Sequence, residues 1–474
     1  MMRRALLSRA LVPAIAAALL AACTVGPDYV KPTPQEPAAF ARAEAGNTTM
    51  PAPADDAFWT RFGDAQLTVL IDEALAANND LRIALSRYDR ANALLRGAKF
   101  DYLPTVTAHA EGRETRVGDQ SLESYEANAQ AAWELDLFGR VRRNVESNRA
   151  DAQATANDLA ALQVAIVGDV ARSYFELRGL QERLRVARGN AENQAETLHL
   201  VQARYDAGRG TEFDTSRASA QLEATRANVP ALEAQVAVTE HRIAVLLGRT
   251  PDALIAELDV PADLPALPDR LDAGTPGELL RRRPDVAAAE LRLHASTARI
   301  GVATADLFPR FTLGGLLGSA TTDAGALFDG GTNTSFVALG IDWSFLDAGR
   351  VRARIAAADA DAEGALAAYR QSVLLALEDT ENARVRHARA RVEDGHRERA
   401  AIDSANAARL ARVRFEAGAA DLFEVLDAER TQLQAQDAFA DARTRSAVSV
   451  VALYRAMAGG WPGKMPLREK IARE

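Results

Sequence analysis

Cys23 is the only cysteine of the chain, and its surroundings indicate acylation rather than a disulfide. It follows Leu20-Ala21-Ala22, which closes an apolar run that begins at Ala10. Arginines precede this run, which is too short to cross a bilayer, so residues 1–22 are predicted to be a cleaved signal peptide. The arrangement resembles the bacterial lipoprotein signal, in which such a cysteine is acylated. Lipoproteins retained in the inner membrane usually carry aspartate after the cysteine, so Thr24 favours the outer membrane. The alternative is an ordinary secretory signal with a chance cysteine.

The other residues show no catalytic or metal-binding constellation. The six histidines have no ligand spacing to one another or to the cysteine, and the five methionines are too few for a thioether metal relay. No G-x-S-x-G, P-loop or H-E-x-x-H motif occurs. We therefore expect no cofactor, no metal and no enzyme activity. Removing residues 1–22 leaves 53 basic against 65 acidic residues, a formal charge of about −12, which is unsuited to nucleic acid.

Much of the chain consists of an internal repeat, which is typical of a symmetric assembly rather than of one catalytic cleft. The repeated segments are Trp133 and Trp343, Gly139–Arg142 and Gly349–Arg352, and Arg204–Gly208 and Arg414–Gly418. Each pair is 210 positions apart, so no net insertion or deletion separates the copies over this stretch. A rigid rod whose two copies must reach the same depth requires such equality of length.

Each copy also contains segments in which apolar and polar residues alternate, as in a strand with one apolar face. In residues 121–137 the apolar set is Tyr125, Ala127, Ala129, Ala131, Trp133 and Leu135. The sequence predicts one β-hairpin per copy, at about 104–137 and about 309–346. Strands of this length suit a tilted membrane crossing, although a soluble sheet with one wet face gives the same pattern. Four strands cannot close a barrel, so several chains must share one.

Long helices are predicted for most of the remainder. Aromatic residues make up only 6% of the chain, and proline is absent from residues 105–229 and 310–461. Helical hairpins are expected at about 139–247 and about 349–458. The first helix of each, about 67 residues, would be roughly 100 Å long. One further helix is expected over 65–99.

The expected fold class is mainly α with a membrane β part: a long α-helical coiled-coil barrel plus four β-strands per chain, arising from an internal duplication. The expected divisions are a signal peptide at 1–22, a lipid anchor and extended tether at 23–60, a first repeat at 61–248, a connector at 249–274, a second repeat at 275–460 and a tail at 461–474.

Several longer motifs occur together in this chain. They are Cys23–Pro32, Glu278–Val286, the two turns that follow Arg204 and Arg414, and Ala456–Trp461. In combination they resemble the lipoprotein branch of the outer-membrane efflux channels of the TolC/OprM/NodT type, over nearly all of the sequence after residue 22. The resemblance implies a homotrimer in the outer membrane of a Gram-negative bacterium, lipid-anchored, with a twelve-stranded barrel and a twelve-helix periplasmic tunnel. It also implies two partners, a periplasmic adaptor protein and an inner-membrane pump, usually of the resistance-nodulation-division (RND) type.

The resemblance assigns roles to the helix-to-helix turns, or tips. The tips at Arg204, Gly208, Arg414 and Gly418 would dock the adaptor and close the tunnel, and the glycines would in any case cap helices and reverse the chain. Phe415 stands where the family's aperture uses a ring hydroxyl paired across helices, so we expect that hydrogen bond to be absent and the gate to be looser or differently tuned. Trp133 and Trp343 would be membrane-interface anchors, or else would pack the barrel against the helices.

Asp214, Glu424 and Asp427 fall where the family places acidic rings at the closed aperture. Asp214 and Glu424 also lie three residues after Thr211 and Asp421, which fits capping boxes and leaves only Asp427 without a local explanation. Three copies of these carboxylates would repel one another, so counter-ions or protonation would have to relieve them.

The leading functional prediction is a passive, trimeric exit duct for small toxic compounds or drugs, the outer-membrane component of a tripartite efflux system. One alternative is the outlet of a type I protein-secretion system. The other is a lipid-anchored coiled-coil tether without a pore, which predicts no alternating strands.

Overall fold

The fold is that of a computed structural model, which describes residues 24–33, 36–41, 57–265, 267, 275–458 and 468. These residues form two compact units. The first contains residues 24–33, Ser86–Asn157 and Asp285–Ser372, and the second contains the other described residues. The units do not follow the two sequence repeats. Each takes a part of each repeat, because the long helices α4 and α9 begin in the first unit and end in the second.

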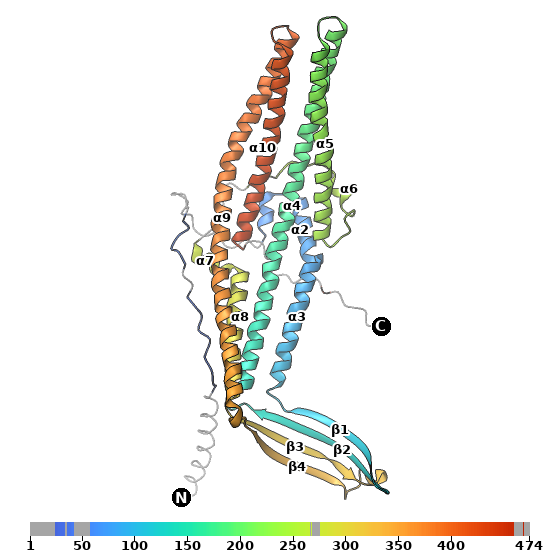
Figure 1. The fold of residues 1–474 in the computed structure, drawn as a ribbon, viewed down its shortest axis with the longest axis vertical. Coiled ribbons are helices and arrows are strands. Elements are labelled where there is room, and N and C mark those ends of the chain that lie inside the picture. The colour runs from blue at the N-terminus through green and yellow to red at the C-terminus, as the bar shows by residue number, and fades with distance from the viewer. Residues whose placement is uncertain are drawn as a thin grey trace. The chain divides into compact units, whose positions relative to one another are not determined.

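A four-stranded antiparallel sheet lies in the first unit (Figure 1). Its strands are β1 (Thr105–Val117), β2 (Gln120–Leu135), β3 (Arg310–Thr321) and β4 (Asn333–Asp342), in the order β1-β2-β3-β4. The pairing of β2 with β3 joins the hairpin of the first copy to that of the second. These strands contradict the tether without a pore, which predicted none.

One face of the sheet is apolar over the half that contains Trp133, and it becomes polar toward the hairpin turns, where Glu114 pairs with Glu123. Residues that pair across antiparallel strands project to the same face. Trp133 pairs with Leu313, which pairs with Leu339, and the next row runs from Ala131 through Gly315 to Val337. On this face Val337 is 81% exposed. The opposite face carries most of the polar residues of β1 and β2, among them His109, Glu111, Glu126, Asn128 and Gln130.

Two helical hairpins have their turns and their returning helices in the second unit (Figure 1). The first joins α4 (Arg140–Asp206) to α5 (Glu212–Leu246), and the second joins α9 (Ala348–Glu416) to α10 (Leu422–Ala456). The outgoing helices have 67 and 69 residues, and the returning helices have 35 each. The two outgoing helices differ by only two residues and the two returning helices are equally long. The predicted mainly helical fold with four strands is confirmed.

The helix expected over 65–99 is instead two helices, α2 (Ala65–Ala77) and α3 (Asn79–Phe100). Asn78 lies between the two helices, and its buried side chain makes two hydrogen bonds that hold the chain at this break. Its amide oxygen accepts from the backbone N–H of Leu81, and its amide nitrogen donates to the carbonyl of Leu246. The other described helices are α6 (Ile255–Leu258), α7 (Pro276–Arg282) and α8 (Pro284–Ala305). Short 3-10 turns lie at Phe58–Phe62, Ala324–Ala326 and Phe345–Asp347.

Candidate functional site

The two tips reverse the chain by the same backbone device. Gly208 and Gly418 adopt left-handed φ angles of 71° and 72°. After α4, the N–H of Arg209 donates to the carbonyl of Arg204 at 2.8 Å, and after α9 the N–H of Ala419 donates to that of Arg414 at 2.8 Å. These are Schellman-type helix ends, in which glycine avoids the strain that a β-carbon would meet. Both predicted caps therefore exist.

In the first tip, Asp214 is committed to a capping box. The Thr211 hydroxyl accepts from the backbone N–H of Asp214 at 3.3 Å, and the Asp214 carboxylate accepts from the backbone N–H of Thr211 at 3.0 Å. It also accepts from the Thr211 hydroxyl at 2.7 Å. The two side chains thus each satisfy one backbone N–H that would otherwise have no partner.

In the second tip, the acidic residues pair with arginines. Asp421 caps α10 by accepting from the N–H of Glu424 at 2.9 Å, but the Glu424 carboxylate lies 3.1 Å from Arg414 on the preceding helix. Asp427 lies 2.5 Å from Arg430, one turn further along α10. The expected need for counter-ions or protonation is therefore reduced, because each of these carboxylates has a cation beside it.

Phe415 links the two tips. The Arg204 guanidinium lies over its ring, 3.9 Å from the centroid, and donates to its backbone carbonyl at 2.7 Å. Phe415 is 5% exposed and belongs to an apolar cluster drawn from both hairpins: Val201, Ala218, Leu422, Val425 and Leu426. The ring hydroxyl is absent as expected, but within one chain a cation–π contact joins the two tips in its place.

A polar seam runs between α4 and the second hairpin below the tips. Arg183, Asn190 and Thr197, spaced by seven residues like the a positions of a heptad, contact α10. Their partners are Asp437 at 2.7 Å, Gln436 at 2.9 Å and Glu429 at 2.7 Å, respectively. Arg204, seven residues further on, bonds to the Phe415 carbonyl. Arg412 of α9 adds a bond to the buried Glu429 at 3.0 Å.

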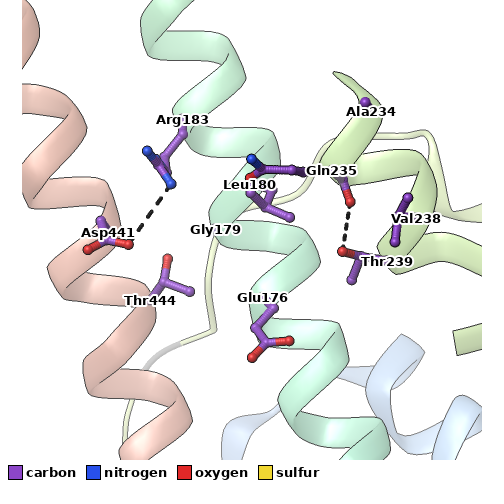
Figure 2. Close-up of a pocket in the computed structure, with 10 residues that line it drawn as sticks. All are labelled: Glu176, Gly179, Leu180, Arg183, Ala234, Gln235, Val238, Thr239, Asp441 and Thr444. Atoms are coloured by element: carbon purple, nitrogen blue, oxygen red, sulfur yellow. Dashed lines mark hydrogen bonds and ion pairs between the residues drawn. The ribbon is translucent and has the colours of Figure 1, made fainter. Parts of the chain in front are cut away.

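Close packing between α4 and α10 continues beyond this seam (Figure 2). A β-carbon on Gly179 would lie 1.9 Å from the Thr444 hydroxyl oxygen, so only glycine fits here without movement of α10. An open hollow of about 450 Å³ lies beside this point, lined by α4, α5 and α10. In Figure 2, Arg183 points toward Asp441 at its edge, 4.0 Å away.

In the first unit, residues 24–33 lie along α4 and α8 as an extended strap. The Tyr29 ring stacks on His294 with centroids 4.3 Å apart, and its hydroxyl donates to Glu290 at 3.2 Å. The buried Arg143 donates to Asp28 at 2.5 Å. Arg143 also donates to the carbonyl of Val25 at 3.4 Å, so specific side chains hold the motif from Val25 to Tyr29. Cys23 itself lies outside the described residues.

A second carboxylate reinforces the strap. Glu146 accepts a hydrogen bond from Arg143, and its carboxylate lies 2.9 Å from His294. The ring of His294 is the one that stacks on Tyr29. Burial alone would raise the pKa of Glu146, but the hydrogen bonds from His294 and Arg143 outweigh it and lower that pKa. The lowered pKa means that this carboxylate stabilises the folded strap when ionised.

The two tryptophans make matching bonds at the end of the sheet. The indole N–H of Trp133 donates to the carbonyl of Tyr102 at 3.1 Å, and that of Trp343 donates to the carbonyl of Leu307 at 3.0 Å. Each acceptor lies two residues before a proline that precedes a strand. Both indoles therefore tie strand ends to helix ends, a contact that is compatible with interface anchoring because Trp343 stays exposed.

Within the described ranges, no group of three or more His, Cys, Asp or Glu residues is placed to hold a metal ion. None of the described helices is both long enough and apolar enough to cross a membrane.

Comparison with known proteins identifies the family. Residues 70–249 and 275–459 match the family described as outer membrane efflux protein. The chain belongs to this family. It is an outer-membrane efflux channel of a Gram-negative bacterium, with its helical part in the periplasm. The two matched segments overlap most of the two predicted repeats, 61–248 and 275–460.

Relatives agree over nearly the whole length. OprJ of Pseudomonas aeruginosa is 33% identical over 460 residues, which cover 93% of this chain and 94% of OprJ. The structure of the outer-membrane channel OprN is 42% identical with a TM-score of 0.87, over 93% of this chain and 100% of that chain. The open state of the MtrE outer membrane channel of Neisseria gonorrhoeae is 28% identical with a TM-score of 0.82, over 94% and 100%. The family, efflux function and location predicted from the motifs are confirmed.

Sequence reasoning missed the residues that join the two hairpins. Buried Thr197 and half-buried Arg412 both donate to the buried carboxylate of Glu429, and neither their types nor their neighbours suggested this arrangement. The seven-residue recurrence of polar residues on α4 is the signal that could have found the seam. This recurrence is hard to recognise in the sequence because the apolar stripe of α4 dominates the residue pattern of that helix.

Proposed function

We propose that three copies of this chain close one twelve-stranded barrel in the outer membrane and one tunnel of helices in the periplasm. The observation that carries the proposal is the exposed apolar face of the sheet, with Val337, Leu339 and Ile341 more than half exposed in the single chain. In a single chain, β1 and β4 leave their outer backbone edges unpaired. Such edges cannot face lipid, and four strands are fewer than the smallest barrels use, so identical neighbours must complete the ring.

The duct serves small toxic compounds or drugs, delivered by an inner-membrane pump of the RND type through a periplasmic adaptor. Relatives carry names that refer to export of solvent, toluene, pyoverdine and cations. Adaptor docking is assigned to the tips around Arg204, Gly208, Arg414 and Gly418, because these turns are the free ends of the hairpins. No atom lies within 4 Å of a β-carbon built on either glycine.

The gate is assigned to Glu424 and Asp427 of the second tip, with Phe415 as the link to the first. Asp214 is assigned chiefly to capping, because its carboxylate is engaged by Thr211. Three carboxylates of each kind around one axis favour cations over anions, an effect that the neighbouring arginines moderate. Trp133 and Trp343 are assigned to the membrane interface.

The N-terminus is assigned to a lipid anchor at Cys23, held against the first unit by the strap. Mass spectrometry of the mature protein should show acyl chains on this residue. An unmodified N-terminus beyond Cys23 would refute the anchor without affecting the channel.

Native mass spectrometry in detergent tests the assembly directly. A mass about three times that of the monomer is expected. A stable, membrane-inserted monomer would contradict the shared barrel, because its sheet edges would have no partners.

A further inference from the structure

Two phenylalanines at matching positions of the repeat are exposed at the tips. Phe213 is the second residue of α5 and is 69% exposed, and Phe423 is the second residue of α10 and is 54% exposed. Isolated exposed apolar residues are common, but clustered aromatic side chains at the end of an elongated element mark a contact surface. The duplication alone explains why both are present, but not why both remain uncovered.

Arg217 joins the two rings. Its guanidinium carbon lies 4.6 Å from the centroid of Phe423 and 6.0 Å from that of Phe213. Within the described residues, no carboxylate or carbonyl lies within bonding distance of this guanidinium. By contrast, Arg204 and Arg414 have acceptors in the tips. Arg217 therefore retains donors that are free to bind another molecule.

The cation is specific to the first tip. The position of Arg217 in the second copy is occupied by Asp427, which is paired with Arg430. The second copy has no arginine at this position, so the repeat alone does not explain an arginine between the two exposed rings. Its charge defines what a partner must bring, because only a carboxylate or a comparable acceptor complements an unpaired guanidinium.

We propose that Phe213, Arg217 and Phe423 form an aromatic–arginine clamp that binds an apolar loop carrying a carboxylate, presented by the periplasmic adaptor. The inference rests on the proposed docking of an adaptor at the tips and specifies its chemistry. The rings supply apolar contact and exclude water, while the guanidinium binds the carboxylate through paired N–H donors. Arginine and aromatic residues are the types that dominate binding energy at such contacts.

Site-specific photo-crosslinking in living cells tests the clamp. A benzophenone amino acid replaces Glu212, which is exposed and adjacent to Phe213, so that the clamp itself stays intact. Mass spectrometry should map the cross-link to a periplasmic loop with an aspartate or glutamate within a few residues. Arg217→Glu should lower the cross-link yield by about tenfold or more, as expected when a hot-spot residue is reversed in charge.

Arg226→Glu is the matched control, since Arg226 is an exposed arginine of the same helix that pairs with Glu223. It should leave the yield within about twofold. Equal effects of the two variants would overturn the clamp. So would cross-links that reach only a second copy of this chain, reach a loop without a carboxylate, or fail to form.

Conductance in planar bilayers separates this inference from the proposed channel. Purified wild-type protein and Arg217→Glu should both insert into the bilayer and conduct, because the clamp acts on the partner and not on barrel assembly. Wild-type protein that does not conduct would refute the proposed channel assembly. Conducting protein whose cross-linking ignores Arg217 would refute the clamp alone.

Discussion

The two tips occupy matching positions of the repeat, with the same glycine conformation, but use their charged residues differently. In the first tip the carboxylate of Asp214 is bound within its own turn by Thr211. In the second, Glu424 pairs with Arg414 of the preceding helix and Asp427 pairs with Arg430. The backbone of the tip is thus constrained by chain reversal, whereas its side chains are free to diverge.

The aromatic position between the tips shows the same divergence. Phe415 of the second tip is buried in a cluster that includes residues of both hairpins, while its counterpart Tyr205 is 41% exposed. One tip therefore provides the contact that joins the hairpins, and the other receives it through Arg204. This asymmetry is compatible with the proposed assignment of the gate to the second tip.

The largest expected effect comes from removing the shared contact. Phe415→Ala should destabilise the tips by about 3 kcal/mol, since it deletes a buried ring and leaves a cavity. Hydrogen exchange of the backbone around 411–426 should accelerate accordingly. Tyr205→Ala, the matched change in the first tip, should accelerate exchange far less because its side chain is already exposed.

Equal effects of Phe415→Ala and Tyr205→Ala would break the comparison. They would mean that the two tips contribute equally to holding the hairpins together, contrary to the burial of Phe415.

Removing the N-cap side chains of α5 and α10 should lower local helix stability by a smaller amount. Thr211→Ala should cost about 1 kcal/mol in local stability of α5, because it removes the side-chain acceptor of a complete capping box. Asp421→Ala should affect α10 by a similar amount through its single cap bond, but should leave the Arg414–Glu424 pair in place. Exchange protection of the first turns of α5 and α10 measures both. If Asp214→Asn left α5 protection unchanged, the carboxylate would have no capping role.

A smaller effect still is expected from pH, which should change the local stability of α9 but not that of α4. His387 of α9 occupies the position that Leu177 occupies in α4, and its Nδ1 lies 3.0 Å from the Ser449 hydroxyl. Burial, followed by the nearby Arg391, lowers the pKa of His387. A lowered histidine pKa gives stability that is present above the unfolded value near 6.5 and lost as pH falls toward the folded value.

Hydrogen exchange corrected for intrinsic rates should therefore show loss of protection around residue 387 between neutral and mildly acidic pH, with α4 near Leu177 unchanged. His387→Leu should abolish the dependence. A parallel loss in both helices would point to a general acid effect instead.

The sequence predicted the features that depend on local pattern and on the repeat. The constant offset of 210 gave the paired hairpins, alternation gave the strands, and Thr211 with Asp214 gave the capping box. It could not predict contacts between distant segments. The break at Asn78 depends on the carbonyl of Leu246, and the stacking of Arg204 on Phe415 depends on how the hairpins pack. Such contacts are set by tertiary geometry, which propensity and spacing do not encode.

Ion selectivity of the purified protein in planar bilayers tests most directly the proposal that the second tip carries the gate. Glu424→Gln combined with Asp427→Asn should shift the reversal potential toward zero and weaken block by divalent cations, because it would remove six carboxylates from the proposed trimeric aperture. Asp214→Asn should lower exchange protection of α5 and leave selectivity nearly unchanged. A shift with Asp214→Asn as large as with the double variant, or no shift with the double variant, would contradict the account.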